Sequence, residues 1–182
     1  MKIIFSDNSL KELLNFRGDI INHFLKNGHE VIILAPNNLE NPIEKYPFFD
    51  KVSYIPLKLD SVGNNPLKDI KYFLNLLYLY KKNKPDYIFH YTIKPNIYGS
   101  IAAKLLNIKS TAMVAGLGSC FSNYSLGDKI ARALYKLGLR FSDKILVLNE
   151  YNYSFLKNNN FVNQDKLILL PGGEGVNIEN FS

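Results

Sequence analysis

The sequence contains a single cysteine, Cys120, and no tryptophan. One thiol cannot form a disulfide within the chain, and such scarcity is typical of proteins from a reducing compartment. No apolar run approaches the roughly 20 residues that span a bilayer. The opening "MKIIFS" lacks the length and the cleavage site of a signal peptide. We therefore expect a cytoplasmic protein.

Several motifs that carry known chemistry are also missing. No G-x-G-x-x-G follows the first apolar run, which disfavours an NAD- or FAD-dependent oxidoreductase, and no Walker A pattern occurs. The three histidines, His23, His29 and His90, are scattered, and no paired C-x-x-C exists to hold a metal ion. We expect no resident cofactor and no metal site.

Arginine is scarce although the net charge is +6: only Arg17, Arg132 and Arg140 accompany 19 lysines among the 22 basic residues. This balance fits a solvated surface, an anionic ligand or an anionic membrane face. Nucleic acid is disfavoured as a partner because the lysines are dispersed and no known binding motif is present.

What the sequence does contain is an alternation of short apolar runs with amphipathic stretches. Several runs, such as "VIILA" and "KILVL", are apolar on both faces, as strands between two helical layers are. The predicted strands are Lys2–Ser6, Glu30–Ala35, Lys51–Ile55, Asp86–Tyr91, Ser110–Ala115, Lys144–Leu148 and Leu167–Leu170. The predicted helices cover 16–27, 66–83, 96–107, 126–141 and 150–158. This order predicts an α/β fold with a Rossmann-like, doubly wound parallel sheet.

In such a sheet, ligands bind beyond the carboxyl ends of the strands. His90, Lys94 and Asn96 follow the fourth predicted strand, where a cation beside a helix start can bind an anion and a histidine can exchange a proton. The alternative is that His90 only ends a strand and Lys94 is solvated. Gly116 and Gly118 follow the fifth strand and could bring backbone N–H groups to a phosphate or sugar hydroxyl, or simply turn the chain.

Two of the predicted helices carry basic stripes. Lys129, Arg132, Lys136 and Arg140 recur at helical spacing on one of them, and Lys68 and Lys71 lie on the other. The second also contains tyrosines at 72, 78 and 80. A solvated face explains such stripes, and so does contact with anionic lipid, which interfacial tyrosines would support.

Five segments, taken in order, resemble family 4 glycosyltransferases of the bacterial branch that builds capsule, lipopolysaccharide and other lipid-linked glycans. They are "FRGDIINHFLKNGHEVIILAP", "KPDYIFHYTIKPNIYGSIAAKLLNI", "VAGLGSCFS", "SDKILVLNEYNYSFL" and "GVNIENF". The resemblance implies half of a GT-B fold, with 1–171 as the amino-terminal acceptor-binding domain and 172–182 as the start of an interdomain hinge. The donor-binding domain with its E-x₇-E motif would lie beyond Ser182.

The resemblance implies an enzyme that transfers a sugar, with retention, from a nucleotide-sugar such as a UDP-sugar to a sugar or an undecaprenyl-pyrophosphate-linked acceptor. The nucleotide-sugar is a substrate, and no metal ion is implied. An acceptor held in the inner leaflet would place the basic, tyrosine-rich helices on the membrane. The chain would then be cytoplasmic and peripheral to the inner membrane.

Residue roles follow the family motifs. The resemblance assigns acceptor contacts to Arg17, His90, Lys94 and Asn96. It places the backbone of Gly116, Leu117 and Gly118, together with Asn149 and Glu150, along the cleft. It assigns no catalytic residue.

Two other functions fit the same pattern. The chain could be a non-catalytic subunit of a glycosyltransferase divided between two chains. It could also belong to a sugar-nucleotide epimerase-like GT-B protein. The motif series favours the acceptor-binding half of a single enzyme, which would be inactive alone because transfer requires donor and acceptor together.

Overall fold

The computed structural model describes residues 1–39, 46–59, 65–118, 121 and 125–171. The predicted hinge at 172–182 lies outside these residues. Within them, seven strands form one parallel sheet in the order β3-β2-β1-β4-β5-β6-β7. The strands are β1 (Lys2–Ser6), β2 (Glu30–Ala35), β3 (Ser53–Pro56), β4 (Tyr87–Tyr91), β5 (Lys109–Val114), β6 (Lys144–Val147) and β7 (Leu167–Leu169). The predicted α/β, doubly wound fold is confirmed.

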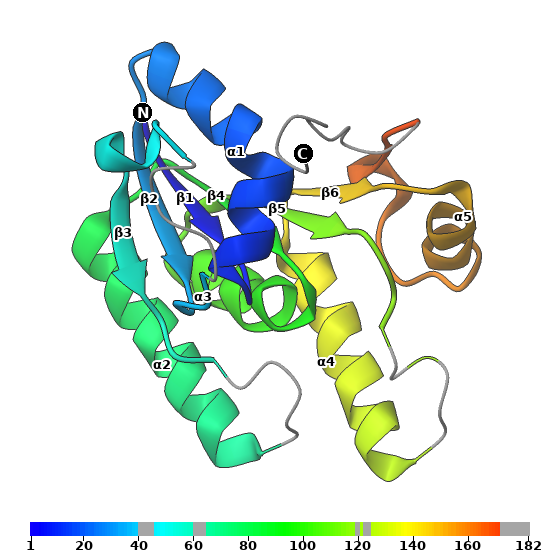
Figure 1. The fold of residues 1–182 in the computed structure, drawn as a ribbon. Coiled ribbons are helices and arrows are strands. Elements are labelled where there is room, and N and C mark those ends of the chain that lie inside the picture. Colours follow the sequence, from blue (N-terminus) through cyan, green and yellow to red (C-terminus); the bar gives the residue numbers. More distant parts are fainter. Residues whose placement is uncertain (40–45, 60–64, 119–120, 122–124, 172–182) are drawn as a thin grey trace.

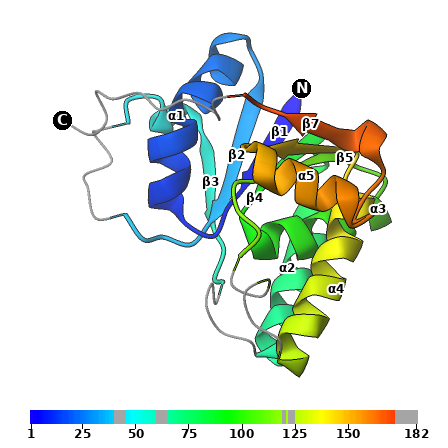
Figure 2. The same ribbon diagram turned by 90° about the vertical axis from the view of Figure 1, so that its right-hand side faces the viewer.

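Helices cover both faces of this sheet (Figures 1 and 2). The α-helices are α1 (Leu10–Lys26), α2 (Pro66–Asn83), α3 (Ser100–Leu105), α4 (Leu126–Phe141) and α5 (Glu150–Asn158). A π-helical turn, η3 (Pro95–Gly99), precedes α3, and two 3₁₀ turns are η2 (Phe49–Lys51) and η5 (Gln164–Lys166). Helix α1 lies over one face, and α2, α3 and α4 lie over the other.

Alternate residues of the central strand show how the two layers form. Ile3 and Phe5 are buried in a cluster with Leu13 of α1, whereas Ile4 between them is buried with Leu76 of α2. A third cluster joins β5 and β6 to α4 and α5. Strands that are apolar on both faces are therefore buried on both faces, as the sequence predicts.

Short polar side chains set the helix starts. Asn65 caps α2, Ser125 and Asp128 form a capping box on α4, and Asn149 caps α5. The first helix was expected to begin at 16 but begins at Leu10, because the Ser9 side chain accepts a hydrogen bond from the backbone N–H of Glu12 at 3.1 Å. Helix α1 therefore begins only a few residues after the end of β1.

The order of the strands reverses beside β1. The chain moves outward from β1 to β2 and β3, then returns through α2 to β4 on the other side of β1. Ligand crevices of open α/β sheets lie at such a switch point, outside the carboxyl ends of the strands. A ligand site is therefore expected at the residues that follow β1, β4 and β5.

Candidate acceptor-binding site

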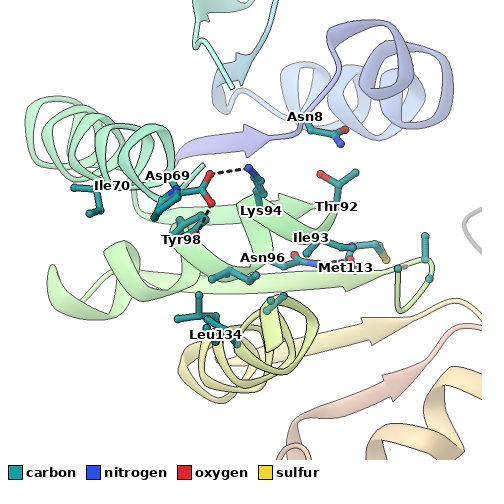
Figure 3. A pocket seen from close by; sticks show the side chains of 18 residues that line it. Asn8, Asp69, Ile70, Thr92, Ile93, Lys94, Asn96, Tyr98, Met113 and Leu134 are labelled. Carbon is teal, nitrogen blue, oxygen red and sulfur yellow. Dashed lines mark hydrogen bonds and ion pairs between the residues drawn. The ribbon is translucent and has the colours of Figure 1, made fainter. Parts of the chain in front are cut away.

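A cavity of about 900 Å³ opens beside the carboxyl ends of β4 and β5, between the first turns of α2 and α4 (Figure 3). Its polar lining comes from Asn8 after β1, Asp69 of α2 and the segment Thr92–Asn96 after β4. Most of the wall is apolar and comes from Ile70, Ile93, Ile97, Met113, Ile130 and Leu134. We call this cavity the α2/α4 pocket.

The floor of the α2/α4 pocket is the "KPNIYG" segment, which forms η3. The Asn96 side-chain N–H donates to the backbone oxygen of Met113 in β5 at 2.7 Å, and the Tyr98 hydroxyl donates to Asp69 of α2 at 3.0 Å. These bonds join η3 to the sheet on one side and to α2 on the other. Asn96 is buried and its remaining amide oxygen has no hydrogen-bond partner among the described residues, so its contact with an acceptor stays a prediction.

His90 lies inside the protein, and its predicted contact with an acceptor stays a prediction. Its ring is fully buried in β4, with Tyr80 Oη 3.0 Å from Nε2 and Ser100 Oγ 3.2 Å from Nδ1. Burial lowers the pKa of His90 to about 3, so the ring is neutral at physiological pH and exchanges no proton there. Gly99 leaves room for it, because a Cβ at Gly99 would lie 2.4 Å from the ring.

Lys94 does reach the α2/α4 pocket, where it forms an ion pair. Its Nζ lies 2.6 Å from Asp69 Oδ1, and both side chains are about seven-eighths buried, at 13% and 15% exposure. Figure 3 shows Lys94 and Tyr98 meeting Asp69 from two sides. Phosphate is also a strong charge-assisted partner of lysine, so an anionic ligand at Lys94 would have to exchange with the Asp69 carboxylate.

Asp69→Asn is expected to lower the free energy of unfolding by about 3 kcal/mol, because it leaves the mostly buried Lys94 without its counter-charge. Inorganic diphosphate should then raise the melting temperature of Asp69→Asn more than that of the parent. Thermal unfolding followed by circular dichroism measures both effects. Asp69→Asn with Lys94→Met is the control, and equal diphosphate stabilisation of parent, single and double variants would contradict the exchange.

The glycines after β5 have different roles. Gly118 has φ +82°, and a Cβ there would lie 2.1 Å from Ile93 Cδ1, so only glycine fits. Gly116 lines the pocket, and a Cβ there would meet nothing within 4 Å. Leu117 between them is buried with the residues of β5 and α4. Gly118 lines the pocket as well, so a ligand can approach the backbone of either exposed glycine.

Arg17 and Asp7 lie together behind β1. The Arg17 guanidinium carbon is 4.8 Å from the centre of the Tyr91 ring, and the side chain is nearly buried. Burial raises the pKa of Asp7 to about 7, against the opposing effect of the nearby Arg17 charge. Sequence reasoning missed Asp7, although a carboxylate directly after a buried strand at the switch point was the available signal. Contact between Arg17 and an acceptor stays a prediction.

Asn149 and Glu150 are not part of the described lining of the α2/α4 pocket, although the Asn149 side chain donates to the backbone oxygen of Ala115, a lining residue, at 3.5 Å. The Asn149 side chain accepts from the backbone N–H of Asn152 at 2.8 Å and so caps α5. Glu150 is exposed in the first turn of that helix. Their placement along an interdomain cleft stays a prediction, because the residues that follow 171 are not described.

The basic residues separate into two groups. Lys68, Lys71 and Lys129 are exposed and Arg132 is partly exposed, on the halves of α2 and α4 near the pocket. Lys136 instead lies 5.2 Å from the centre of the Phe161 ring, and Arg140 donates to the backbone oxygen of Phe161. These two side chains hold the segment after α5 against α4.

The tyrosines of α2 were expected at an interface, and this is wrong for two of them. Tyr72 and Tyr80 are buried, whereas Tyr78 is exposed.

Among the described residues, no three His, Cys, Asp or Glu side chains lie close enough to hold a metal ion. No helix of the described part of the chain is long and apolar enough to cross a membrane.

Solved structures of longer proteins share this fold. The UDP-GlcNAc 2-epimerase of Neisseria meningitidis bound to UDP-GlcNAc matches 93% of this chain and 46% of its own, with a TM-score of 0.66 and 16% identity. MurG of Acinetobacter baumannii matches 94% of this chain and 45% of its own, with a TM-score of 0.60 and 14% identity. At these identities the likeness shows the fold alone.

A curated relative extends the likeness to sequence. The N,N'-diacetylbacillosaminyl-diphospho-undecaprenol alpha-1,3-N-acetylgalactosaminyltransferase of Campylobacter jejuni is 26% identical over 191 aligned positions. The match covers all of this chain and 48% of the relative, so the chain spans about half the length of that enzyme. The sequence profile of the glycosyl transferase 4-like family matches residues 2–149, which is most of the chain. Because this profile matches more than half of its residues, the chain belongs to the glycosyl transferase 4-like family.

Proposed function

We propose that this chain is the acceptor-binding half of a retaining glycosyltransferase. Together with a donor-binding half, it would transfer a sugar from a nucleotide-sugar, such as a UDP-sugar, to an undecaprenyl-diphosphate-linked acceptor. The product would enter a surface polysaccharide such as capsule or lipopolysaccharide, or another lipid-linked glycan. The Campylobacter jejuni relative, whose name includes a diphospho-undecaprenol acceptor, supports this class of substrate.

The observation that carries the proposal is the combination of the α2/α4 pocket with the outer faces of the two helices. On α2, Leu67, Ile70 and Leu74 are exposed at helical spacing, and on α4, Leu126 and Ile130 are exposed. Figures 1 and 2 show the first turns of these helices projecting together beyond the sheet. Exposed apolar groups clustered around a pocket mark an interaction surface.

The basic residues beside these apolar side chains favour an anionic bilayer as the surface that they meet. Lys71 lies four residues after Leu67 and three before Leu74, and Lys129 lies three after Leu126, so each lysine shares a helix face with exposed apolar side chains. Each basic residue near an anionic membrane contributes about 1 kcal/mol to binding. We therefore place the chain peripherally on the inner membrane, with the α2/α4 pocket opening toward the lipid.

Nanodiscs of anionic lipid test the proposal directly. The chain should bind nanodiscs that contain an undecaprenyl-diphosphate-linked N-acetylated sugar at least about tenfold more tightly than nanodiscs that contain undecaprenyl phosphate, because only the former offers sugar and diphosphate together. Surface plasmon resonance measures both affinities. Equal affinities would contradict acceptor recognition.

Two variants separate lipid contact from acceptor recognition in this experiment. Leu67→Asp with Leu126→Asp should weaken binding to both kinds of nanodisc and leave their ratio unchanged. Leu105→Asp is the matched control, because Leu105 is also well exposed but ends α3 at the opposite edge of the sheet. A double variant that binds both nanodiscs like the control would contradict membrane docking through α2 and α4.

A further inference from the structure

The lining of the α2/α4 pocket is unsuited to a sugar over most of its surface. The side chains of Ile93, Ile97 and Leu134 have no polar atom that could bond to a hydroxyl group. A sugar hydroxyl buried against them would lose its hydrogen bonds to water without replacement, which is costly. Among the described residues of the lining, the polar side chains are Asn8, Asp69, Thr92, Lys94, Asn96 and Tyr98. The greater part of the pocket therefore fits an apolar ligand.

The apolar lining continues onto the outer surface. Ile70 and Ile130 both line the pocket and are about half exposed, at 55% each. They stand on opposite sides of the opening, on α2 and α4, and each belongs to the exposed apolar row of its helix. An apolar chain that passes between them can stay in contact with apolar surface from the outside of the molecule to the pocket floor.

We propose that the α2/α4 pocket binds the first isoprene units of the acceptor's polyprenyl chain, so that the lipid is gripped by the protein as well as by the bilayer. This inference rests on the proposed function and adds a subsite to it. The volume of about 900 Å³ lies within the roughly 300–1,000 Å³ of pockets that enclose drug-sized ligands. Several branched five-carbon units therefore have room to bind.

The charges in the pocket orient the chain. Among the described residues of the lining, Lys94 is the lysine, and it lies near the carboxyl ends of β1 and β4, where Asn8 and Thr92 also line the wall. The backbone of Gly116 is accessible at the same edge. A diphosphate bound there leaves its prenyl chain running between Ile93 and Leu134 toward the opening. The attached sugar then projects beyond the ends of the strands, where a donor-binding domain would meet it.

Short, water-soluble prenyl diphosphates test this subsite without a membrane. Below their micelle concentrations, farnesyl diphosphate should bind at least about tenfold more tightly than geranyl diphosphate, and geranyl diphosphate more tightly than inorganic diphosphate, because each added isoprene unit buries further apolar surface. Isothermal titration calorimetry measures all three affinities.

Methionine provides a spectroscopic check at atomic resolution. The chain has two methionines: Met113 lines the pocket, whereas Met1 is exposed at the opposite edge of the sheet. In a protein labelled with ¹³C at the methionine methyl groups, farnesyl diphosphate should shift the Met113 signal and leave that of Met1 in place. Inorganic diphosphate should move the Met113 signal much less.

A matched pair of double variants locates the effect. Ile70→Ser with Ile130→Ser should lower the affinity for farnesyl diphosphate at least about tenfold and leave that for inorganic diphosphate within about twofold, since it removes apolar contacts and adds no charge. Leu74→Ser with Leu137→Ser is the control, because these residues are exposed on the same helices but lie outside the lining. Loss of farnesyl binding in both double variants would overturn the assignment to this pocket.

Failure of this inference and failure of the proposed function give different results. Equal affinities for the three diphosphates, or an unmoved Met113 signal, would overturn the prenyl subsite, while a preference for acceptor-containing nanodiscs would still support acceptor binding. Chain-length dependence without a nanodisc preference would support the prenyl subsite and contradict recognition of the sugar-bearing acceptor.

Discussion

Replacing Gly138 with alanine is expected to lower the free energy of unfolding by about 3 kcal/mol, even though alanine is the better helix former. A Cβ at this position of α4 would lie 2.7 Å from both Asn96 O and Ile97 Cα. These are backbone atoms of η3, so a side-chain rotation cannot relieve the overlap, and α4 must move away from the pocket floor. The gain of about 1 kcal/mol in helix propensity offsets only part of this cost.

Gly127→Ala is the matched control on the same helix. A Cβ there would meet only Ser125 Oγ, at an ordinary 3.7 Å, so its effect on stability should be small or favourable. Urea unfolding followed by circular dichroism compares the two variants. In a protein of this size, Gly138→Ala should lower the melting temperature by roughly 6–12 °C. Equal stability of the two variants would show that the backbone of η3 shifts to accommodate the added methyl group at little cost in free energy.

The same close packing explains most of the motif by which the chain resembles its family. Gly99 accommodates the His90 ring, Gly138 accommodates η3 and Gly118 accommodates Ile93. Asn96 and Tyr98 hold η3 by hydrogen bonds to β5 and α2. These residues shape the pocket floor, and the contact of Asn96 with an acceptor stays a prediction. Within the "KPNIYG" segment, Lys94 is the residue whose charged group reaches the pocket wall.

Local signals in the sequence were sufficient for most of the elements. The helices α2, α4 and α5 have the bounds that the sequence predicts, because Asn65, Ser125 and Asn149 cap them. The strands agree within one or two residues at each end, since apolar side chains on both faces leave few alternatives. The predicted start of α1 at residue 16 is later than the observed one at Leu10, because the prediction does not take into account the capping signature of Ser9 and Glu12.

The site was harder to predict because it depends on contacts between distant segments. The sequence identified the segments after β4 and β5, and the fold rule for parallel sheets then gave the correct edge. It could not show that α2 and α4, some 60 residues apart, form the two walls of one pocket. The sequence also could not show which polar groups are buried. His90 and Lys94 are only four residues apart, but His90 is enclosed because Tyr80 and Ser100, from other elements, pack against its ring.

Asp7 is expected to make the protein less stable as the pH rises from about 4 to about 8. Its pKa is raised from the ordinary value of 3.8 to about 7, with burial as the largest cause, Arg17 opposing it and Glu12 adding to it. Between these values the folded state keeps the proton that the unfolded state releases, so a higher pH favours unfolding. The stability contributed by the protonated carboxyl is complete below pH 3.8 and is lost by about pH 7. The loss amounts to about 4 kcal/mol, at about 1.4 kcal/mol per pH unit.

Asp7→Asn isolates this contribution, because asparagine has the shape of aspartic acid and carries no charge. The variant should match the parent near pH 4 and exceed its free energy of unfolding by up to about 4 kcal/mol near pH 8. Urea unfolding across this range measures the difference, and Asp19→Asn, an exposed substitution on α1, is the control. Parallel pH profiles for parent and Asp7→Asn would mean that Arg17 keeps the carboxylate ionised in the folded state. The pair would then be a buried ion pair at the switch point, and removing its negative charge would destabilise the protein at neutral pH instead of stabilising it.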